Sequence, residues 1–475
     1  MTVGVAAVPA PRVRTFFGHP IGLGYLVFAE AWERFSYYGM QSLLVLYMGQ
    51  QLLLPGHVEH VAGFAAFRAG IESVYGHLST AALASAIFGL YAGCVYLTPI
   101  AGGFIADRLL GRTLTVTIGA ILMAIGHFLM AFEASFLLAL TCLLVGVGCF
   151  KGNIASQVGE LYAPGDLRRA DAFQVFLLGV NVAVIVSPLV CGTLGQKVAW
   201  HWGFGAAGVG MLIGLAVYLS GRRWLPPDTV RRVPARPGEG KLARIQRPRL
   251  APGEIKTVAV LVALLPVLAL SGVGNQEIFN AYLVWGNANY DLVFFGQSMP
   301  VTWLISLDAI ISSVTIVASV AFWRWWAKRR REPQEITKLA IGALIGGLAP
   351  LALTVASLQQ AASGHKVGLF WGLVFHIVND IGFANIFPVG LALFSRAGPR
   401  AIAGLIIGVY YLNLFASNML VGYLGGLLEP LGGAKFWALH AALVFGAGLA
   451  LFAFRAAFGP LLSPTVDPEA VEASA

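Results

Sequence analysis

Twelve long apolar stretches follow one another along the 475-residue chain, and they constrain its fold more than any other feature. A helix needs about 20 mostly apolar residues to cross the hydrocarbon layer of a membrane. Only 11% of the residues are charged, whereas soluble domains average about 25%. Because a lipid-exposed backbone must satisfy its own hydrogen bonds, we expect an all-α membrane protein. The twelve expected spans are residues 21–53, 79–106, 113–133, 135–160, 172–196, 203–221, 256–286, 300–326, 336–358, 367–394, 401–428 and 435–457.

The distribution of basic residues predicts the orientation of these spans. Of the 31 Lys and Arg residues, 25 fall in the tails, in the even-numbered loops or at the span ends beside them, and two lie well inside spans. The remaining four are Arg68, Lys197, Lys366 and Lys435, in the odd-numbered loops or at their edge. Basic residues collect on the cytoplasmic side of membrane proteins, so we expect both termini to be cytoplasmic. The net charge of +9 is therefore a topology signal, and we do not expect nucleic-acid binding.

The spans divide six and six around a basic, Pro-rich segment. We expect an N-terminal tail (1–20), a six-helix bundle (21–221), a cytoplasmic linker (222–255), a second six-helix bundle (256–458) and a C-terminal tail (459–475). Two repeated bundles are typical of secondary transporters. The span count alone does not exclude a receptor, a channel or a membrane enzyme.

Ionisable residues inside the spans narrow these alternatives. A charged residue near the centre of a membrane helix costs roughly 2.5–3.5 kcal/mol on insertion scales, so each must face a partner or a water-filled cavity. The expected spans contain seven such residues: Glu30, Glu33, Arg34, Lys151, Glu277, Asp308 and Asp380.

The densest group lies in the first span. Glu30, Glu33, Arg34, Tyr37 and Tyr38 recur at i, i+3, i+4, i+7 and i+8, which is one face of an α-helix. A carboxylate beside an arginine is held ionised, whereas desolvation favours its neutral form, so small changes around it could move its proton. The face fits a proton-coupling site, and it equally fits a static salt-bridge cluster that locks the helix to its neighbours.

Other polar residues give weaker signals. Lys151 lies among small residues in the fourth span, where its ammonium could meet a solute or a first-span glutamate. Asp107, in a glycine-containing loop between the second and third spans, fits control of opening better than substrate binding. An isolated Tyr96 or Asn181 is more often a contact between helices.

Several classes of site find no support. The four cysteines all fall in spans, without the spacing of a metal site or a disulfide framework. None of the nine histidines has metal-ligand spacing, and core packing is the simpler interpretation of His127 and His376. We find neither a P-loop nor a nucleophile elbow, so we expect neither an ATP-driven pump nor an enzyme, and no cofactor.

Four motifs, in order, resemble those of the proton-dependent oligopeptide transporter (POT) family. They are Glu30-xx-Glu33-Arg34-Phe35-x-Tyr37-Tyr38, the Gly102-to-Arg112 loop, Phe150-Lys151-Gly-Asn153 and Phe387-Pro388-Val389-Gly390-Leu391. The resemblance runs through most of the chain and is strongest over residues 16–200. It implies a major facilitator fold, a bacterial-type inner membrane, and inward symport of protons and small peptides through a central cavity.

The resemblance also implies roles for individual residues. Protons would be coupled by Glu30, Glu33, Arg34, Lys151 and the displaced Glu277. The substrate would be bound by Tyr37, Tyr38, Tyr96, Lys151, Asn181, Gln276, Asp308 and Tyr410. Opening would be controlled by Asp107, Arg108 and Arg112.

The second half departs from the family pattern. Phe383 stands where the family carries the glutamate that receives the peptide amino group. In the seventh span the acidic position reads Asn275-Gln276-Glu277, so its glutamate is displaced along the helix, and Asp308 stands where an asparagine is usual. Asp308, Glu277 or Asp380 could supply a substitute anion.

Our leading hypothesis is therefore a monomeric, proton-coupled importer of di- and tripeptides that works by alternating access. The first alternative, motivated by Phe383, is symport of another small charged solute on the same scaffold. The second is a non-transporting sensor that has kept the fold.

Overall fold

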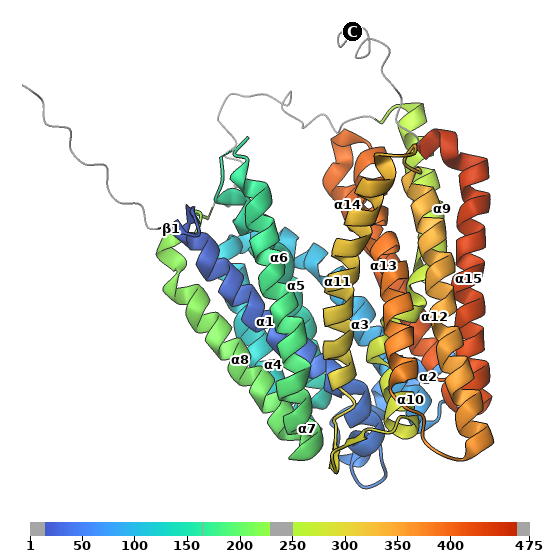
Figure 1. Ribbon diagram of the computed structural model, residues 1–475. Helices are drawn as coiled ribbons and strands as arrows, with labels where there is room; N and C mark the ends of the chain where they lie inside the picture. Colours follow the sequence, from blue (N-terminus) through green and yellow to red (C-terminus); the bar gives the residue numbers. More distant parts are fainter. Residues whose placement is uncertain (1–14, 164, 229–249, 463–475) are drawn as a thin grey trace, which may run out of the picture.

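The computed structural model describes residues 15–163, 165–228 and 250–462, and these ranges are almost entirely helical (Figure 1). The helices are long because each apolar run can satisfy its backbone hydrogen bonds only within itself.

The first half of the chain contains seven long or medium helices with short elements between them. Its elements are β1 (Thr15–Phe16), β2 (His19–Pro20), α1 (Ile21–Tyr47), η1 (Met48–Leu52), η2 (Val58–His60), α2 (Phe64–Tyr75), α3 (Thr80–Ile105), η3 (Ala106–Leu110), α4 (Arg112–Leu129), η4 (Glu133–Ser135), α5 (Phe136–Glu160), α6 (Arg168–Ser187), η5 (Pro188–Gly192), α7 (Thr193–Lys197), α8 (Trp200–Ser220) and η6 (Arg222–Trp224).

The second half has the same character. Its elements are α9 (Pro252–Gln276), η8 (Glu277–Phe279), α10 (Ala281–Asn289), β3 (Val293–Phe294), β4 (Gln297–Ser298), α11 (Trp303–Ala327), α12 (Glu335–Ser363), α13 (Phe370–Ala397), η9 (Arg400–Ile402), α14 (Ala403–Gly425) and α15 (Leu428–Leu462). The two strand pairs, β1–β2 and β3–β4, are short antiparallel hairpins.

Eleven helical stretches in the described part of the chain are long and apolar enough to cross a membrane. They match the second to the twelfth expected spans. The first expected span is the 27-residue helix α1, which is long enough but contains Glu30, Glu33 and Arg34. The three charged residues that reduce its hydropathy are the ones that the sequence marks for function.

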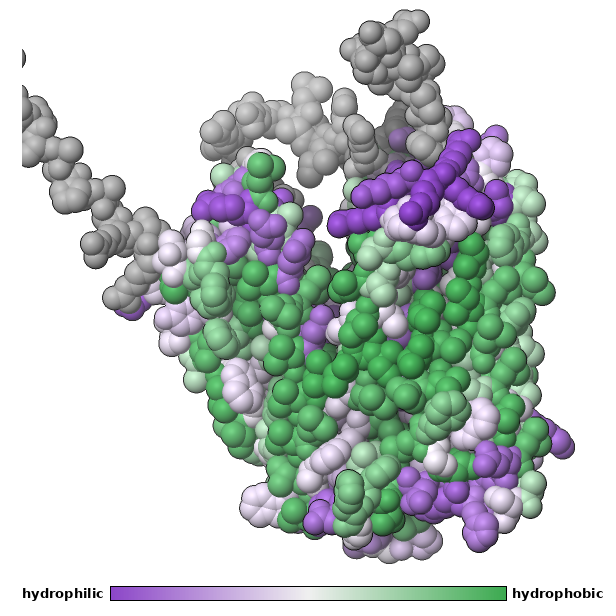
Figure 2. Space-filling view, viewed as in Figure 1, coloured by the Kyte–Doolittle hydropathy of each residue, from purple (hydrophilic) through white to green (hydrophobic). Residues whose placement is uncertain are grey.

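The outer surface fits a lipid environment. Figure 2 shows a broad apolar band between two polar ends. Large apolar side chains such as Leu177, Val314 and Leu358 are exposed on it. A soluble protein rarely leaves so continuous an apolar surface in water, and the multi-pass membrane topology predicted from the sequence is confirmed.

The two halves meet most closely at one end of the molecule, which we call the closed end. There Trp303 Nε1 donates to Thr193 Oγ1 at 2.8 Å, and Ser306 Oγ donates to the Ile185 carbonyl at 2.7 Å. Ser79 Oγ donates to Glu429 Oε2 at 3.0 Å. These bonds join α3, α6 and α7 of the first half to α11 and α15 of the second.

Glycines allow α3 and α14 to cross closely at the same end. A Cβ atom on Gly89 would lie 2.5 Å from both the Asn418 carbonyl oxygen and Gly422 Cα. Membrane helices commonly use small residues for such approaches. At the opposite end, which carries β1 and the end of α15, the halves separate and the surface is hollowed between them (Figures 1 and 2).

The expected loop between the second and third spans is instead mostly helical. Gly102 and Gly103 lie in α3, which continues through η3 as far as Leu110. A Cβ atom on Gly102 would collide with the Gly148 carbonyl of α5, so this glycine serves helix packing. The turn is made by Gly111 alone, at φ +79°, a region that glycine adopts readily.

The expected tails and linker fall largely outside the described residues. Of the linker, only residues 222–228 and 250–255 are described, and residues 1–14 and 463–475 of the tails are not. The domain boundaries remain predictions.

Candidate functional site

The polar face of α1 forms a buried charge cluster. Arg34 Nε lies 3.0 Å from Glu30 Oε1 and 2.6 Å from Glu33 Oε2. Glu30, Glu33 and Arg34 are 5%, 0% and 3% exposed. One guanidinium therefore serves two carboxylates inside the protein, and the face predicted from the helical period is the one that points inward.

Several atoms of this cluster have no hydrogen-bond partner. Glu30 Oε2, Glu33 Oε1 and Arg34 Nη2 are buried without one, whereas Glu33 Oε2 is ion-paired with Arg34 Nε. A buried carboxylate oxygen without a bond costs free energy unless a proton or a further donor reaches it. The cluster therefore leaves a place for a proton or a further donor at Glu30 Oε2 and Glu33 Oε1.

Lys151 of α5 lies beside this cluster. It interacts electrostatically with Glu30 and Glu33, but no acidic side chain in the described ranges is within ion-pair distance of its ammonium. Lys151 Nζ instead lies 4.9 Å from the centre of the Tyr96 ring, a cation–π contact. The ammonium is half-buried and keeps its donors for another partner.

Aromatic side chains extend from the cluster to the other half. Tyr37 packs edge-on against Tyr38, with ring centres 5.2 Å apart. Tyr38 approaches Phe279 of η8 at 6.0 Å. Tyr96 stacks on Tyr411 of α14 at 6.5 Å with 12° between the ring planes. The Tyr38–Phe279 and Tyr96–Tyr411 contacts cross between the halves, so side chains of both halves meet around the cluster.

The remaining expected substrate residues differ in accessibility. Asn181 of α6 is exposed, and Gln276 of α9 is half-buried and accepts from Asn418 Nδ2 at 3.1 Å. Tyr410 is 1% exposed, and its hydroxyl donates to the Phe387 carbonyl at 2.7 Å. Tyr411, the next residue, is half-buried, whereas Tyr410 is enclosed. Tyr411 was not among the residues expected from the sequence.

Glu277 has a complete set of partners within the second half. His440 Nε2 lies 3.1 Å from Glu277 Oε1, while Asn280 Nδ2 and the Ala281 amide donate to Oε2 at 3.3 and 3.1 Å. Both Glu277 and His440 are 0% exposed. The hydrogen-bond partners of Glu277 therefore all lie in the second half, and its expected role in proton coupling with the α1 cluster stays a prediction.

Asp308 and Asp380 lie near a second histidine. His376 Nδ1 lies 2.8 Å from Asp308 Oδ1, and His376 Nε2 lies 2.9 Å from the Tyr282 hydroxyl. Asp380 is 1% exposed, and Asn379 Nδ2 donates to its Oδ1 at 3.4 Å. From the sequence, core packing was the simpler interpretation of His376. That interpretation does not account for its bond to the Asp308 carboxylate.

The three residues expected to control opening lie at the end where the halves separate. Arg112 pairs with Asp107 at 3.3 Å and also with Glu160 at the end of α5. The Arg108 guanidinium lies over the Phe104 ring, 6.0 Å from its centre. All these partners belong to the first half. The contacts that hold the two halves together, such as Ser79–Glu429, lie at the closed end and were not predicted.

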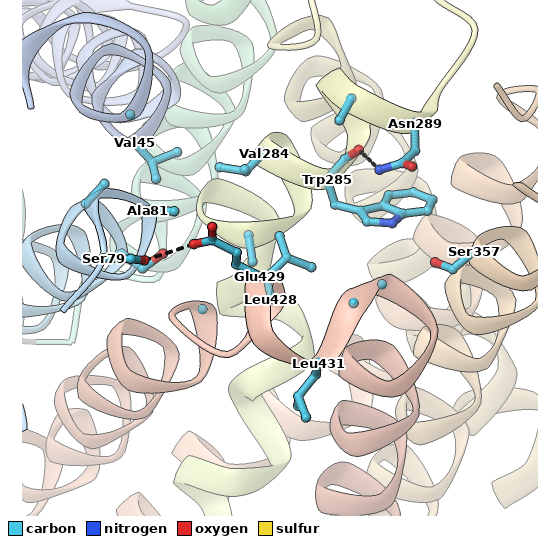
Figure 3. A pocket seen from close by; sticks show the side chains of 18 of the residues that line it. Val45, Ser79, Ala81, Val284, Trp285, Asn289, Ser357, Leu428, Glu429 and Leu431 are labelled. Carbon is cyan, nitrogen blue, oxygen red and sulfur yellow. Dashed lines mark hydrogen bonds between the residues drawn. The ribbon is translucent and has the colours of Figure 1, made fainter. Parts of the chain in front are cut away.

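A separate cavity of about 910 Å³ lies at the closed end. It is lined from both halves, by Ser79 and Val45 on one side and by Trp285, Ser357 and Glu429 on the other (Figure 3). The Ser79–Glu429 hydrogen bond crosses it. No residue expected from the sequence to couple protons or bind substrate lines this cavity.

Comparison with known proteins gives consistent matches. The model of the POT family matches residues 113–231. The chain is 28% identical to the peptide transporter YePEPT of Yersinia enterocolitica, over 88% of this chain and 89% of that protein. It is 29% identical to a di-/tripeptide transporter of Lactococcus lactis, over 90% of this chain and 93% of that protein.

Solved structures match over nearly the whole chain. A mutant of the peptide transporter POT in complex with alafosfalin is 26% identical and superposes with a TM-score of 0.81, covering 95% of this chain and 98% of that one. A POT family transporter in complex with 5-aminolevulinic acid is 22% identical, with a TM-score of 0.77, and covers 95% and 99%. The fold is thus that of the major facilitator transporters, and the matches support a transporter similar to those of the POT family.

Proposed function

We propose that this protein is a proton-coupled symporter that imports di- and tripeptides by alternating access. It works as a monomer in a bacterial-type inner membrane, with both termini in the cytoplasm, and uses protons as the coupling ion without a bound cofactor. The positions of the basic residues along the sequence support this orientation.

The observation that carries the proposal is the excess of acid over base in the α1 cluster. Two buried carboxylates share Arg34, and Glu33 Oε1 has no hydrogen-bond partner. Desolvation makes a second buried negative charge costly, so a proton or a nearby cation is needed to stabilise it. Lys151, which lies close by without an ion pair, can supply that charge in one state and release it in another.

The substrate class is supported by the surroundings of Lys151. The ammonium lies over the ring of Tyr96, which itself stacks on Tyr411, so it offers donors to a carboxylate beside ring faces that suit a short apolar side chain. A peptide carboxylate would compete with the glutamates for Lys151. Binding of the peptide would then favour protonation of Glu33. In this way the transport of the peptide would be linked to the transport of the proton. The relatives named as peptide transporters support the same class.

The arrangement of the halves supports alternating access. The contacts at the closed end shut one side, while the hollow between the halves opens at the end where β1 and the end of α15 lie. With cytoplasmic termini, this conformation faces the cytoplasm. Import requires a second conformation in which Ser79–Glu429 and Thr193–Trp303 are broken.

The test is uptake of radiolabelled dialanine by the purified protein in liposomes, with and without an inward proton gradient. We expect accumulation only with the gradient, and competition by unlabelled di- and tripeptides. If dialanine is neither accumulated nor a competitor of any accumulated solute, the peptide proposal is wrong. Binding without flux under every gradient would indicate the sensor alternative.

The second candidate, symport of another small charged solute, rests on Phe383. Its ring stacks on Phe387 at 5.6 Å with 7° between the planes, and it replaces the acidic residue of the family pattern with an apolar surface. An apolar surface of this kind cannot form an ion pair with the ammonium group of a peptide. Competition by amino acids and organic anions that exceeds competition by dialanine would favour this candidate.

A further inference from the structure

A chain of hydrogen bonds in the second half joins the partly exposed Asp308 to the core. Asp308 Oδ1 bonds to His376 Nδ1 at 2.8 Å, and His376 Nε2 bonds to the Tyr282 hydroxyl at 2.9 Å. His376 and Tyr282 are 0% exposed, whereas the Asp308 side chain is 13% exposed. Water can therefore reach this chain only at Asp308.

The bonding pattern fixes where protons lie when the chain is least protonated. An ionised Asp308 only accepts, so His376 Nδ1 must carry a hydrogen. Nε2 then accepts from the Tyr282 hydroxyl, and the neutral histidine uses both of its ring nitrogens. An additional proton can reside on the second oxygen of Asp308, or on Nε2 if the Tyr282 hydroxyl rotates to become the acceptor.

Asp380 makes this additional proton necessary. It lies one helical turn after His376 on α13, its Oδ2 is buried without a hydrogen-bond partner, and its charge interacts with that of Asp308. Two neighbouring carboxylates with limited access to water resist being ionised together. His376 when neutral offers no charge to balance them.

The other titratable groups around the cluster do not remove this need. Tyr290 packs edge-on against Tyr282 at 6.1 Å, and both are phenols. The Glu277–His440 pair lies beyond Trp437, whose ring meets both Tyr282 and His440. His440 Nδ1 bonds to the Phe436 carbonyl, so one shared proton already satisfies that pair. On the neighbouring α12, α9 and α6, the other charged residues lie near the helix ends, namely Glu335, Lys338, Glu254, Lys256, Arg168, Arg169 and Asp171.

We propose that Asp308, His376 and Asp380 form a second proton-binding site, in the half of the protein opposite the α1 cluster. The site takes one proton from water at Asp308, holds it on Asp308 or His376, where it offsets the charge of Asp380, and returns it to water at Asp308, with no other bond made or broken. This inference rests on the proposed function, because it assigns the site to the same transport cycle.

The position of the site suggests how its proton acts on the cycle. Ser306, two residues before Asp308 on α11, donates to the Ile185 carbonyl in the other half at the closed end. Protonation removes the repulsion between Asp308 on α11 and Asp380 on α13, so it stabilises the packing of these two helices. Loss of the proton loosens the packing of α11 against α13. This packing lies beside the Ser306–Ile185 contact, which must break when the closed end opens.

The experiment measures how many protons are coupled to each peptide. Proteoliposomes with an imposed pH gradient are loaded with different dialanine concentrations, and the peptide gradient that stops net flux gives the ratio. This ratio is thermodynamic, so a variant that is merely slow does not change it. We expect Asp380→Asn and His376→Gln each to lower the ratio by about one relative to the wild type. Glu59→Gln, in an exposed loop, should keep the wild-type ratio.

The outcomes separate this inference from the proposed function. If the wild type shows no proton-coupled flux, the proposed function fails. If the wild type is coupled and both variants keep its ratio, the second site does not exist. For a variant too slow to give a balance point, proton uptake by the purified protein is titrated from neutral to mildly acidic pH. One proton fewer than the wild type supports the site, and an equal number overturns it.

Discussion

The two halves of the molecule both bury carboxylates inside the membrane, but they balance them differently. In the first half, Glu30 and Glu33 share Arg34, and Lys151 is left without an ion pair. In the second half, Glu277 is matched by His440, and Asp308 by His376. The first-half cluster has buried atoms without hydrogen-bond partners and nearby cations, whereas both carboxylate oxygens of Glu277 are hydrogen-bonded.

The difference shows which charges can change state. A carboxylate with a full set of short-range partners has one preferred protonation state, and altering it costs its bonds. A carboxylate with an unpartnered oxygen, beside an arginine and a lysine, can be stabilised either by a proton or by a nearby cation. We therefore assign mobile protons to the first-half cluster and, in the second half, to the Asp308–His376–Asp380 site rather than to Glu277.

The largest expected effect in transport is that of Lys151→Ala. Removing the ammonium leaves a peptide carboxylate without its cation and Glu33 without its alternative partner. We expect dialanine uptake under a proton gradient to fall to the level of empty liposomes, with normal amounts of protein in the membrane. Lys435→Ala, in the closed-end cavity, is the matched control. Uptake by Lys151→Ala above half that of the wild type would remove the distinction between the two halves.

A large effect on stability is expected for Glu277→Ala. The change leaves His440 Nε2 and the Ala281 amide without these acceptors in a buried place, and Asn280 Nδ2 keeps only the Val421 carbonyl. Breaking one side of a buried pair typically costs about 3–5 kcal/mol. We expect a clear fall in the thermal unfolding midpoint in detergent, measured by intrinsic fluorescence.

The matched control for that prediction is Glu277→Gln, which keeps an oxygen acceptor for Asn280 and should lose less stability. If Glu277→Ala is as stable as the wild type but no longer couples protons, then Glu277 belongs with the mobile carboxylates, as the sequence suggested.

A moderate effect is expected for Tyr411→Leu. The substitution removes the stacking partner of Tyr96 across the two halves. Aromatic pairs contribute about 0.5–1.5 kcal/mol beyond their buried area, which corresponds to a roughly 2–10-fold rise in the KM for dialanine. Tyr410→Phe, which removes a buried hydroxyl that bonds only to a backbone carbonyl, should leave KM closer to the wild-type value. The reverse order would indicate that Tyr410 contacts substrate.

The smallest effect is expected for Asp107→Asn. Asp107 is exposed, and surface ion pairs of this kind contribute about 0.2–1 kcal/mol. We expect the initial rate of dialanine uptake to change by less than ~5-fold. A complete loss of uptake would show that the Asp107–Arg112–Glu160 group controls opening more strongly than the inter-half contacts at the closed end do.

The sequence predicted the parts of the molecule that depend on local pattern. Hydrophobic length fixed the spans, and the helical period placed Glu30, Glu33 and Arg34 on one inward face. Both follow from physical rules that act over a few residues. Even the low hydropathy of α1 is a local property, caused by these three charges.

Long-range contacts were beyond local reasoning. Glu277 and His440 are 163 residues apart, and Asp308 and His376 are 68 apart. Nothing in the spacing of either pair signals a contact, since it is set by how four helices pack. Gly102 was wrongly placed in a loop for the same reason: its neighbour, the Gly148 carbonyl, belongs to another helix.

The central claim is that the α1 carboxylates couple protons to peptide uptake, and the most direct test compares the wild type with Glu33→Gln. Dialanine accumulation is measured in proteoliposomes with and without an inward proton gradient, at equal protein content. The account predicts accumulation above the external concentration only for the wild type with the gradient. Accumulation by Glu33→Gln that follows the gradient as in the wild type would contradict it.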